Sequence, residues 1–325
     1  MTSVDAPRSG WADLDGRVHW VDHGGPADGP LLVCVHGLGG SHLNWAALAP
    51  LLVPTCRVVA LDLAGFGLTR GAGRSTSVLG NRDLVHRFVA EVVGGPAIVV
   101  GNSMGGLITA RLAADHPDDV AGVVLLDPAV PPALRSRPDP LVLGMFAAYF
   151  TPGVGRLVIR TRRARTAEDD ARDTLRLCCA RPERVAPEVL RAHVELAERR
   201  EWYPELEAEF VEATRSLLVA MARRRQYRAT LARITAPVLL VHGRKDRLVP
   251  VASARAIARA HPGWRYEEVE DAGHVLQLEV PERMAHLVLD WLAHEGAGAA
   301  EAARHAGRRP IRLQEVTDRL PIVST

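Results

Sequence analysis

The chain has 325 residues, of which 47% are hydrophobic and 24% are charged, and its formal net charge is +2. This length allows one large domain with an insertion or two domains, and the nearly neutral charge argues against a nucleic-acid or anionic-membrane partner. No apolar run approaches the length of a transmembrane helix, and we expect no signal segment and no membrane association. The four cysteines form no recognisable disulfide framework, so we expect reduced thiols and a cytoplasmic location.

Short apolar strands alternate with amphipathic helices along most of the chain. Strands are predicted at residues 17–22, 31–36, 57–62, 97–102, 120–127, 237–243 and 265–269. Helices are predicted at residues 43–52, 81–93, 104–116, 251–260 and 281–294. This alternation is typical of an α/β fold with a mainly parallel sheet and helices on both faces. In such a sheet, sites assemble in the loops beyond the carboxyl ends of the strands.

The alternation stops between residues 131 and 231, a segment rich in Arg and Glu with helical spacing and no convincing strand. An insertion of this kind between two strands of one sheet predicts a helical lid. The aromatic residues of the lid either pack it on the core or line an apolar substrate pocket. The candidates for a pocket are Phe146, Tyr149, Phe150, Trp202 and Tyr203.

The lid divides the predicted core into two parts. We expect a first core part at 1–130, the lid at 131–231, a second core part at 232–295 and a C-terminal tail at 296–325. Residues 296–300 are rich in Gly and Ala and look like a flexible join. The sequence leaves open whether the tail is disordered or packs on the body of the protein.

The stretch 97–106 reads as a buried strand that runs into a serine flanked by glycines, with a helix-forming stretch after it. This is the G-x-S-x-G nucleophile elbow, a sharp turn that exposes a serine hydroxyl and aims it at a base. Gly101 and Gly105 stand two residues on either side of Ser103, where side chains would collide as strand and helix cross. We therefore predict Ser103 as a nucleophile.

Two polar residues follow the elbow in the chain order Ser, Asp, His that a triad of this type requires. Asp246 directly follows an apolar strand, and His274 follows a weaker one. His274 would take the Ser103 proton and pass it to the leaving group, and Asp246 would hold the imidazole in the right tautomer. Asp127, at the end of an earlier strand, is the alternative acid. We favour Asp246 because it stands at the more usual strand end.

Another buried strand ends in the glycine-rich turn 37–40, which leaves backbone N–H groups free. Together with the elbow, this pattern resembles the α/β-hydrolase superfamily, of the lidded type with one core domain. The resembling positions are 36–39, 62–67, 101–106, Asp246 and 273–274. The resemblance implies that Leu38 and Met104 donate their backbone N–H groups to an oxyanion. Members with haloalkane dehalogenase or epoxide hydrolase activity carry Asp at the nucleophile position, and Ser103 argues against both activities.

Other polar residues are assigned supporting roles. His36 is expected to brace the oxyanion loop by hydrogen bonding, and Asp62 to anchor a loop rather than to react. We find no His, Cys, Asp and Glu pattern with metal-ligand spacing, and the glycine turn lacks the Gly-Lys-Ser/Thr ending of a phosphate loop. It also lacks the third glycine of a dinucleotide fingerprint. We therefore expect no metal and no cofactor.

These residues predict a serine hydrolase that cleaves a carboxylic ester or thioester of a small molecule with an apolar acyl part. One alternative is a carbon–carbon bond hydrolase of the meta-cleavage-product type. The elbow resembles that group, but Val275 stands where the group usually has Trp. An acyltransferase is a second alternative, and the complete triad disfavours a non-enzymatic binding protein. Homo-oligomer formation stays open.

Overall fold

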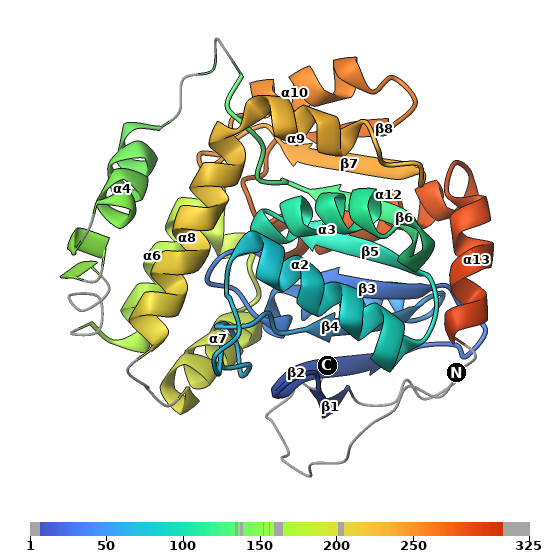
Figure 1. The fold of residues 1–325 in the computed structure, drawn as a ribbon, viewed down its shortest axis with the longest axis horizontal. Helices are drawn as coiled ribbons and strands as arrows, with labels where there is room; N and C mark the ends of the chain where they lie inside the picture. Colours follow the sequence, from blue (N-terminus) through green and yellow to red (C-terminus); the bar gives the residue numbers. More distant parts are fainter. Residues whose placement is uncertain are drawn as a thin grey trace.

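Eight strands form a single sheet in the described part of the chain, in the order β1-β2-β4-β3-β5-β6-β7-β8 (Figure 1). This computed structural model describes residues 7–133, 136, 139–151, 153–155, 157–158, 165–200 and 205–307. The strands are β1 (Arg8–Asp13), β2 (Arg17–Gly24), β3 (Leu31–Val35), β4 (Arg57–Leu61), β5 (Ala97–Asn102), β6 (Val120–Leu126), β7 (Val238–Gly243) and β8 (Arg265–Val269). The β1–β2 and β2–β4 pairs are antiparallel, and the remaining pairs are parallel. The predicted fold class is confirmed.

The central strands are buried on both faces, which explains their continuous apolar sequences. Alternate residues of β3 belong to two separate cores: Leu31 and Val33 contribute to one, and Leu32 and Cys34 to the other. The strand β8 lies at the edge and is half-buried throughout, so its Glu and Arg residues are tolerated and its apolar pattern is weak. The sequence missed β1, the other edge strand, which pairs with β2.

Helices cover both faces of the sheet (Figure 1). The first core includes side chains of α2 (Val78–Arg87), the π-helical turn η2 (Phe88–Val93), α3 (Met104–Asp115), α9 (Arg224–Leu231) and α10 (Val251–Ala260). The second core includes side chains of α1 (Ala49–Leu52), α11 (Leu276–Glu279), α12 (Pro281–Ala293) and α13 (Ala297–Gly307). The predicted helix at 43–52 is wrong as a single element. It divides into the short 3-10 helix η1 (His42–Trp45) and α1, which has a proline in its first turn.

Between β6 and β7 the described residues form helices and no strand. They are α4 (Pro140–Phe150), α6 (Ala167–Cys178), η4 (Pro182–Arg184), α7 (Pro187–Arg199) and α8 (Leu206–Ala222), followed by α9. Figure 1 shows α4, α6, α7 and α8 gathered on one side of the sheet, apart from the helices on its faces. We call residues 131–231 the cap; the division of the chain into domains stays a prediction.

The prediction of a flexible join at residues 296–300 is wrong, because residues 297–300 form the first turn of α13. Ala299, Ala300 and Ala303 are buried in the second core, where small side chains let the helix approach the sheet closely. A Cβ placed on Gly122 of β6 would lie 2.9 Å from the Cβ of Ala299. The tail beyond residue 307 lies outside the described residues. Among the described residues, no helix is both long and apolar enough to cross a membrane.

Candidate active site

The backbone turns sharply at Ser103, between β5 and α3. Its φ of 55° and ψ of −119° are strained for a residue with a side chain. The turn depends on two glycines with no room for a Cβ. A Cβ on Gly105 would lie 2.1 Å from the Val35 carbonyl oxygen, and one on Gly101 would lie 2.4 Å from the Gly105 carbonyl oxygen. The start of α3 therefore lies directly against the ends of β3 and β5, and Ser103 projects from this crossing.

The glycine-rich turn after β3 lies beside the serine. A Cβ placed on Gly37 would be 3.0 Å from the Cβ of Ser103. The N–H of Gly40 donates to the carbonyl of Gly37 at 3.1 Å, with Gly39 in the left-handed region. This turn leaves the Leu38 N–H outside its own hydrogen bond. Met104 is the first residue of α3, so its N–H has no acceptor within the helix. Both proposed oxyanion donors thus belong to segments that adjoin Ser103.

His274 and Asp246 form a hydrogen-bonded pair. The Nδ1–H of His274 donates to Oδ2 of Asp246 at 2.7 Å, and both residues are buried. The other carboxylate oxygen, Oδ1, accepts the N–H groups of Leu248 and Val249 at 2.8 and 2.9 Å. These bonds fix the carboxylate, which in turn selects the imidazole tautomer whose Nε2 carries a free lone pair. That tautomer is the one a general base requires.

Asn102 links the elbow to the histidine loop, a role that the sequence analysis missed. Its side-chain Nδ2 donates to the carbonyl oxygens of His274 and Leu126, both at 3.0 Å. The next residue, Ser103, accepts the Ala129 N–H on its own carbonyl at 2.8 Å. The elbow is therefore bonded on one side to the His274 loop and on the other to the loop after β6. An amide immediately before the serine is the sequence signal that could have indicated this role.

Asp127, the alternative acid, makes no hydrogen bond to His274 among the contacts of the described residues. Its Oδ1 accepts the Gly243 N–H at 2.7 Å, and Oδ2 lacks a partner in the part of the chain that the structure describes. His242 stands between the two aspartates, with Nδ1 at 3.7 Å from Asp127 and Nε2–H donating to Val249. Burial, and then the nearby Asp246 carboxylate, raise the pKa of Asp127 well above its usual range. The geometry favours Asp246 as the partner of the histidine.

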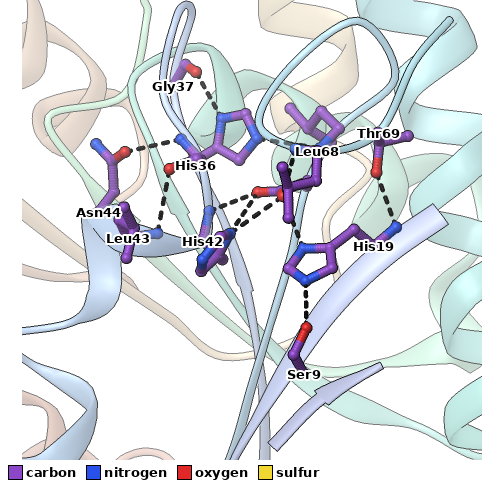
Figure 2. Close-up of polar contacts among 12 residues, drawn as sticks. Ser9, His19, His36, Gly37, His42, Leu43, Asn44, Leu68 and Thr69 are labelled. Carbon is purple, nitrogen blue, oxygen red and sulfur yellow. Dashed lines mark hydrogen bonds and ion pairs between the residues drawn. The ribbon is translucent and has the colours of Figure 1, made fainter. Parts of the chain in front are cut away.

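Asp62 bonds loops beside the turn at residues 37–40, which we call the oxyanion turn after its proposed role, and its partners His19, His42 and Leu68 are labelled in Figure 2. Its carboxylate accepts bonds from the backbone N–H of His42 at 2.6 Å, from the Nδ1 of His19 at 2.8 Å and from the Leu68 N–H at 2.9 Å. Burial alone would raise the pKa of Asp62. The charge of His42 and the hydrogen bonds from His19 and His42 outweigh it and hold the pKa well below the usual range. The carboxylate is thus a structural acceptor, in agreement with the expected anchoring role.

His36 stabilises the same turn through two hydrogen bonds. Its Nδ1–H donates to the Gly37 carbonyl at 2.7 Å, and its Nε2 accepts the Leu63 N–H at 3.0 Å (Figure 2). The bond that Nε2 accepts requires the neutral ring, because both nitrogens of a protonated ring are donors. Burial lowers the pKa of His36 to about 4, so the ring is neutral across the physiological range.

Aromatic side chains lie next to the oxyanion turn. We call Phe66, Phe210 and Tyr149 the aromatic wall; the last two belong to the cap. A Cβ on Gly39 would lie 3.5 Å from the Phe210 ring. Phe210, on α8, packs against Phe66 with ring centroids 6.2 Å apart and against Tyr149 of α4 at 5.4 Å. Of the aromatic lid residues singled out in the sequence, Tyr149 is therefore in this wall and Phe146 is half-buried. Trp202, Tyr203 and the side chain of Phe150 lie outside the described residues.

Comparison with known proteins identifies the family. The family model described as alpha/beta hydrolase fold matches residues 30–281. The chain therefore belongs to this family, and it is an α/β-hydrolase enzyme.

Two curated relatives and one solved structure illustrate the similarity. Monoacylglycerol lipase abhd6-A of Xenopus laevis is 25% identical over 278 residues, which cover 84% of this chain and 78% of that protein. Pimeloyl-[acyl-carrier protein] methyl ester esterase of Aromatoleum aromaticum is 29% identical over 276 residues, which cover 80% of this chain and 97% of that protein. The crystal structure of Cfl2 from Burkholderia cenocepacia has a TM-score of 0.75 at 21% identity, and the match covers 90% of this chain and 97% of Cfl2. This last similarity shows the fold alone.

Buried neutral histidines predict acid sensitivity of the fold. Burial lowers the pKa of His23 and of His36 from 6.5 to about 4. Between pH 6.5 and about pH 4, these histidines bind protons in the unfolded chain but not in the native state. The free energy of unfolding therefore falls as the pH is lowered through this window. We expect a loss of about 2 kcal/mol for each histidine in the free energy of unfolding between pH 7 and pH 5. Urea unfolding at the two pH values measures this difference.

Two variants test whether His23 causes part of this pH dependence of stability. Neither ring nitrogen of His23 has a hydrogen-bond partner among the described residues, so His23→Leu should keep its stability at pH 7. The same variant should lose only the part of the pH dependence that His23 causes. Leu79 is 49% exposed and does not titrate, so the control Leu79→Ala should leave the pH dependence unchanged. Equal pH dependence in the wild type and His23→Leu would contradict this interpretation.

Proposed function

We propose that the protein hydrolyses carboxylic esters or thioesters through an acyl-enzyme on Ser103, with His274 as base and Asp246 as the acid that orients it. The observation that carries the proposal is the 2.7 Å bond from His274 to Asp246, on a loop that Asn102 ties to the serine elbow. A strained serine next to free backbone donors and an oriented imidazole can perform nucleophilic acyl transfer.

The proposed reaction has two stages. The Ser103 Oγ attacks the carbonyl carbon while its proton moves to Nε2 of His274, and the N–H groups of Leu38 and Met104 stabilise the oxyanion. The bond from carbon to the leaving oxygen or sulfur then breaks, and the leaving group takes the proton from His274. Water next attacks the acyl-enzyme and gives a proton to His274. The Ser103–carbon bond breaks, the serine regains its proton, and the carboxylic acid leaves.

The proposed substrate is a small molecule with an apolar acyl part. The aromatic wall of Phe66, Phe210 and Tyr149 adjoins the oxyanion turn, where the chain of an acyl group would lie. The two curated relatives are named as a monoacylglycerol lipase and a methyl ester esterase, both of which act on acyl esters. Four cysteines that form no disulfide agree with the further proposal that the enzyme works in the cytoplasm.

Replacing the nucleophile provides the first test. Ser103→Ala should lower kcat on p-nitrophenyl esters by about 10⁶-fold, as expected for loss of a triad nucleophile. A fluorophosphonate probe should label the wild type and the control variant Ser75→Ala, which removes an exposed hydroxyl, but not Ser103→Ala. Labelling that persists in Ser103→Ala would exclude this serine as the nucleophile. Release of the acyl group to an added alcohol rather than to water would assign an acyltransferase.

The acid is tested by comparing two aspartates. Asp246→Asn removes the carboxylate that selects the His274 tautomer, and the expected loss in kcat is about 10⁴-fold. Asp127→Asn should cost far less, because an Asn oxygen can still accept the Gly243 N–H. Steady-state kinetics of both variants decide between them. A larger loss for Asp127→Asn would transfer the role to the earlier strand.

The substrate proposal predicts a change in chain-length preference. Phe210→Ala should lower kcat/KM for long acyl esters by an amount worth about 1–3 kcal/mol and change it little for the acetyl ester. The measurement is kcat/KM over p-nitrophenyl esters of increasing acyl length. Leu143→Ala is the matched control in the cap, because Leu143 is 52% exposed. A uniform decrease at all lengths, with a lower Tm, would mean that Phe210 serves packing alone.

A further inference from the structure

A buried carboxylate outside the proposed triad connects the histidine loop to the cap. Glu279, the last residue of α11, is 2% exposed. Its Oε2 accepts the N–H groups of Gly273 at 2.8 Å and Ala180 at 3.2 Å, and its Oε1 accepts the N–H of Arg181 at 2.7 Å. Gly273 immediately precedes His274, while Ala180 and Arg181 follow the cap helix α6. One side chain therefore bonds both segments.

The peptide of the histidine itself is in contact with the cap. The His274 N–H donates to the Cys178 carbonyl at 2.6 Å, at the end of α6. On its other side, the His274 carbonyl accepts from Asn102. A Cβ on Gly273 would lie 2.2 Å from the Cys178 oxygen, so the two backbones approach as closely as a glycine allows. In the part of the chain that the structure describes, the cap thus supplies one of the two polar contacts that fix the histidine backbone.

Apolar side chains surround these bonds. Cys179, Val185 and Val189 of the cap form a buried cluster with Val275, which follows His274, and Leu278, which precedes Glu279. Burial strengthens the hydrogen bonds to the carboxylate, because the local dielectric is low and water does not compete for the donors.

Surface ion pairs between the cap and the histidine loop contribute less to the stability of this contact. Asp271 pairs with Arg181 at 2.6 Å and with Arg184 at 2.9 Å, but the arginine side chains are 51% and 34% exposed. Exposed pairs of this kind contribute little, because solvent screens them and long side chains lose entropy. The buried carboxylate with its three N–H donors is the stronger connection between the cap and the histidine loop.

We propose that Glu279 is a positioning residue, which holds the His274 loop against cap residues 178–181 and so makes the docked cap part of the support for the base. This inference rests on the proposed role of His274. Loss of the connection lets the histidine backbone shift relative to Ser103. Proton transfer depends on that distance, so the chemical step slows even for a substrate that makes no use of the aromatic wall.

The test uses Glu279→Gln in the full chain with p-nitrophenyl acetate, an ester too small to depend on Phe210. A Gln side chain keeps one acceptor oxygen and turns an NH₂ group towards the N–H donors, so at least one of the three bonds is lost. We expect kcat to fall by about 10²-fold with little change in KM. The NMR resonance of the His274 Nδ1 proton, which is bonded to Asp246, should also shift or broaden.

Asp22→Asn is the matched control. Asp22 is another buried carboxylate that accepts a backbone N–H, from Gly24, and pairs with Arg57, but it lies on β2, far from the elbow in the sheet order. This variant should lower the Tm while leaving kcat and the Nδ1 proton resonance as in the wild type. A Glu279→Gln enzyme with lowered Tm but wild-type kcat and resonance would overturn the proposal.

A second variant covers the case in which Glu279→Gln does not fold. Val189→Ala loosens the apolar cluster from the cap side and leaves Glu279 and the histidine loop intact. It should lower kcat on the same ester without raising KM, and an unchanged kcat would overturn the proposal. Failure of the proposed function is distinguishable, since it would appear as a wild type that does not hydrolyse the ester or as an active Ser103→Ala variant.

Discussion

The close crossing of β3, β5 and the start of α3 is the constraint on which the site depends. Ser103 can adopt its left-handed backbone only because Gly101 and Gly105 let the elements approach to distances that a Cβ would forbid. The same approach brings the oxyanion turn to the serine, since Gly37 lies at contact distance from it. A backbone strained in this way persists because the buried strands around it over-determine its position.

Around this crossing, buried carboxylates organise the loops. Asp62 bonds the segments that support the oxyanion turn, Asp246 bonds the loop after β7, and Glu279 bonds the histidine loop to the cap. Each accepts backbone N–H groups, which compensates the cost of removing the charge from water. Loops that would otherwise be mobile are thereby held at defined positions, which nucleophilic catalysis requires to within a fraction of an ångström.

The cap contacts the loop of the proposed base as well as the oxyanion turn. The aromatic wall of α4 and α8 lies at the oxyanion turn, while the end of α6 lies at the histidine. Different parts of one insertion thus adjoin the two halves of the site. On the proposed function, we expect a substitution in the cap to act on substrate preference or on the chemical step, depending on which of these junctions it disturbs.

Local patterns in the chain were sufficient to predict the parallel sheet, the elbow at Ser103 and the two residues that form the buried His274–Asp246 pair. Each depends on a short apolar strand followed by a turn, and such patterns are readable within about ten residues. The sequence already favoured Asp246 over Asp127, but the hydrogen bond from His274 that supports this choice needed the tertiary structure. So did the roles of Asn102 and Glu279, whose bonds span 172 and 99 positions of the chain. The packing of α13 was hidden for a related reason. An alanine-rich segment has little periodic signal of its own, and it is helical here because the sheet offers a surface that small side chains fit.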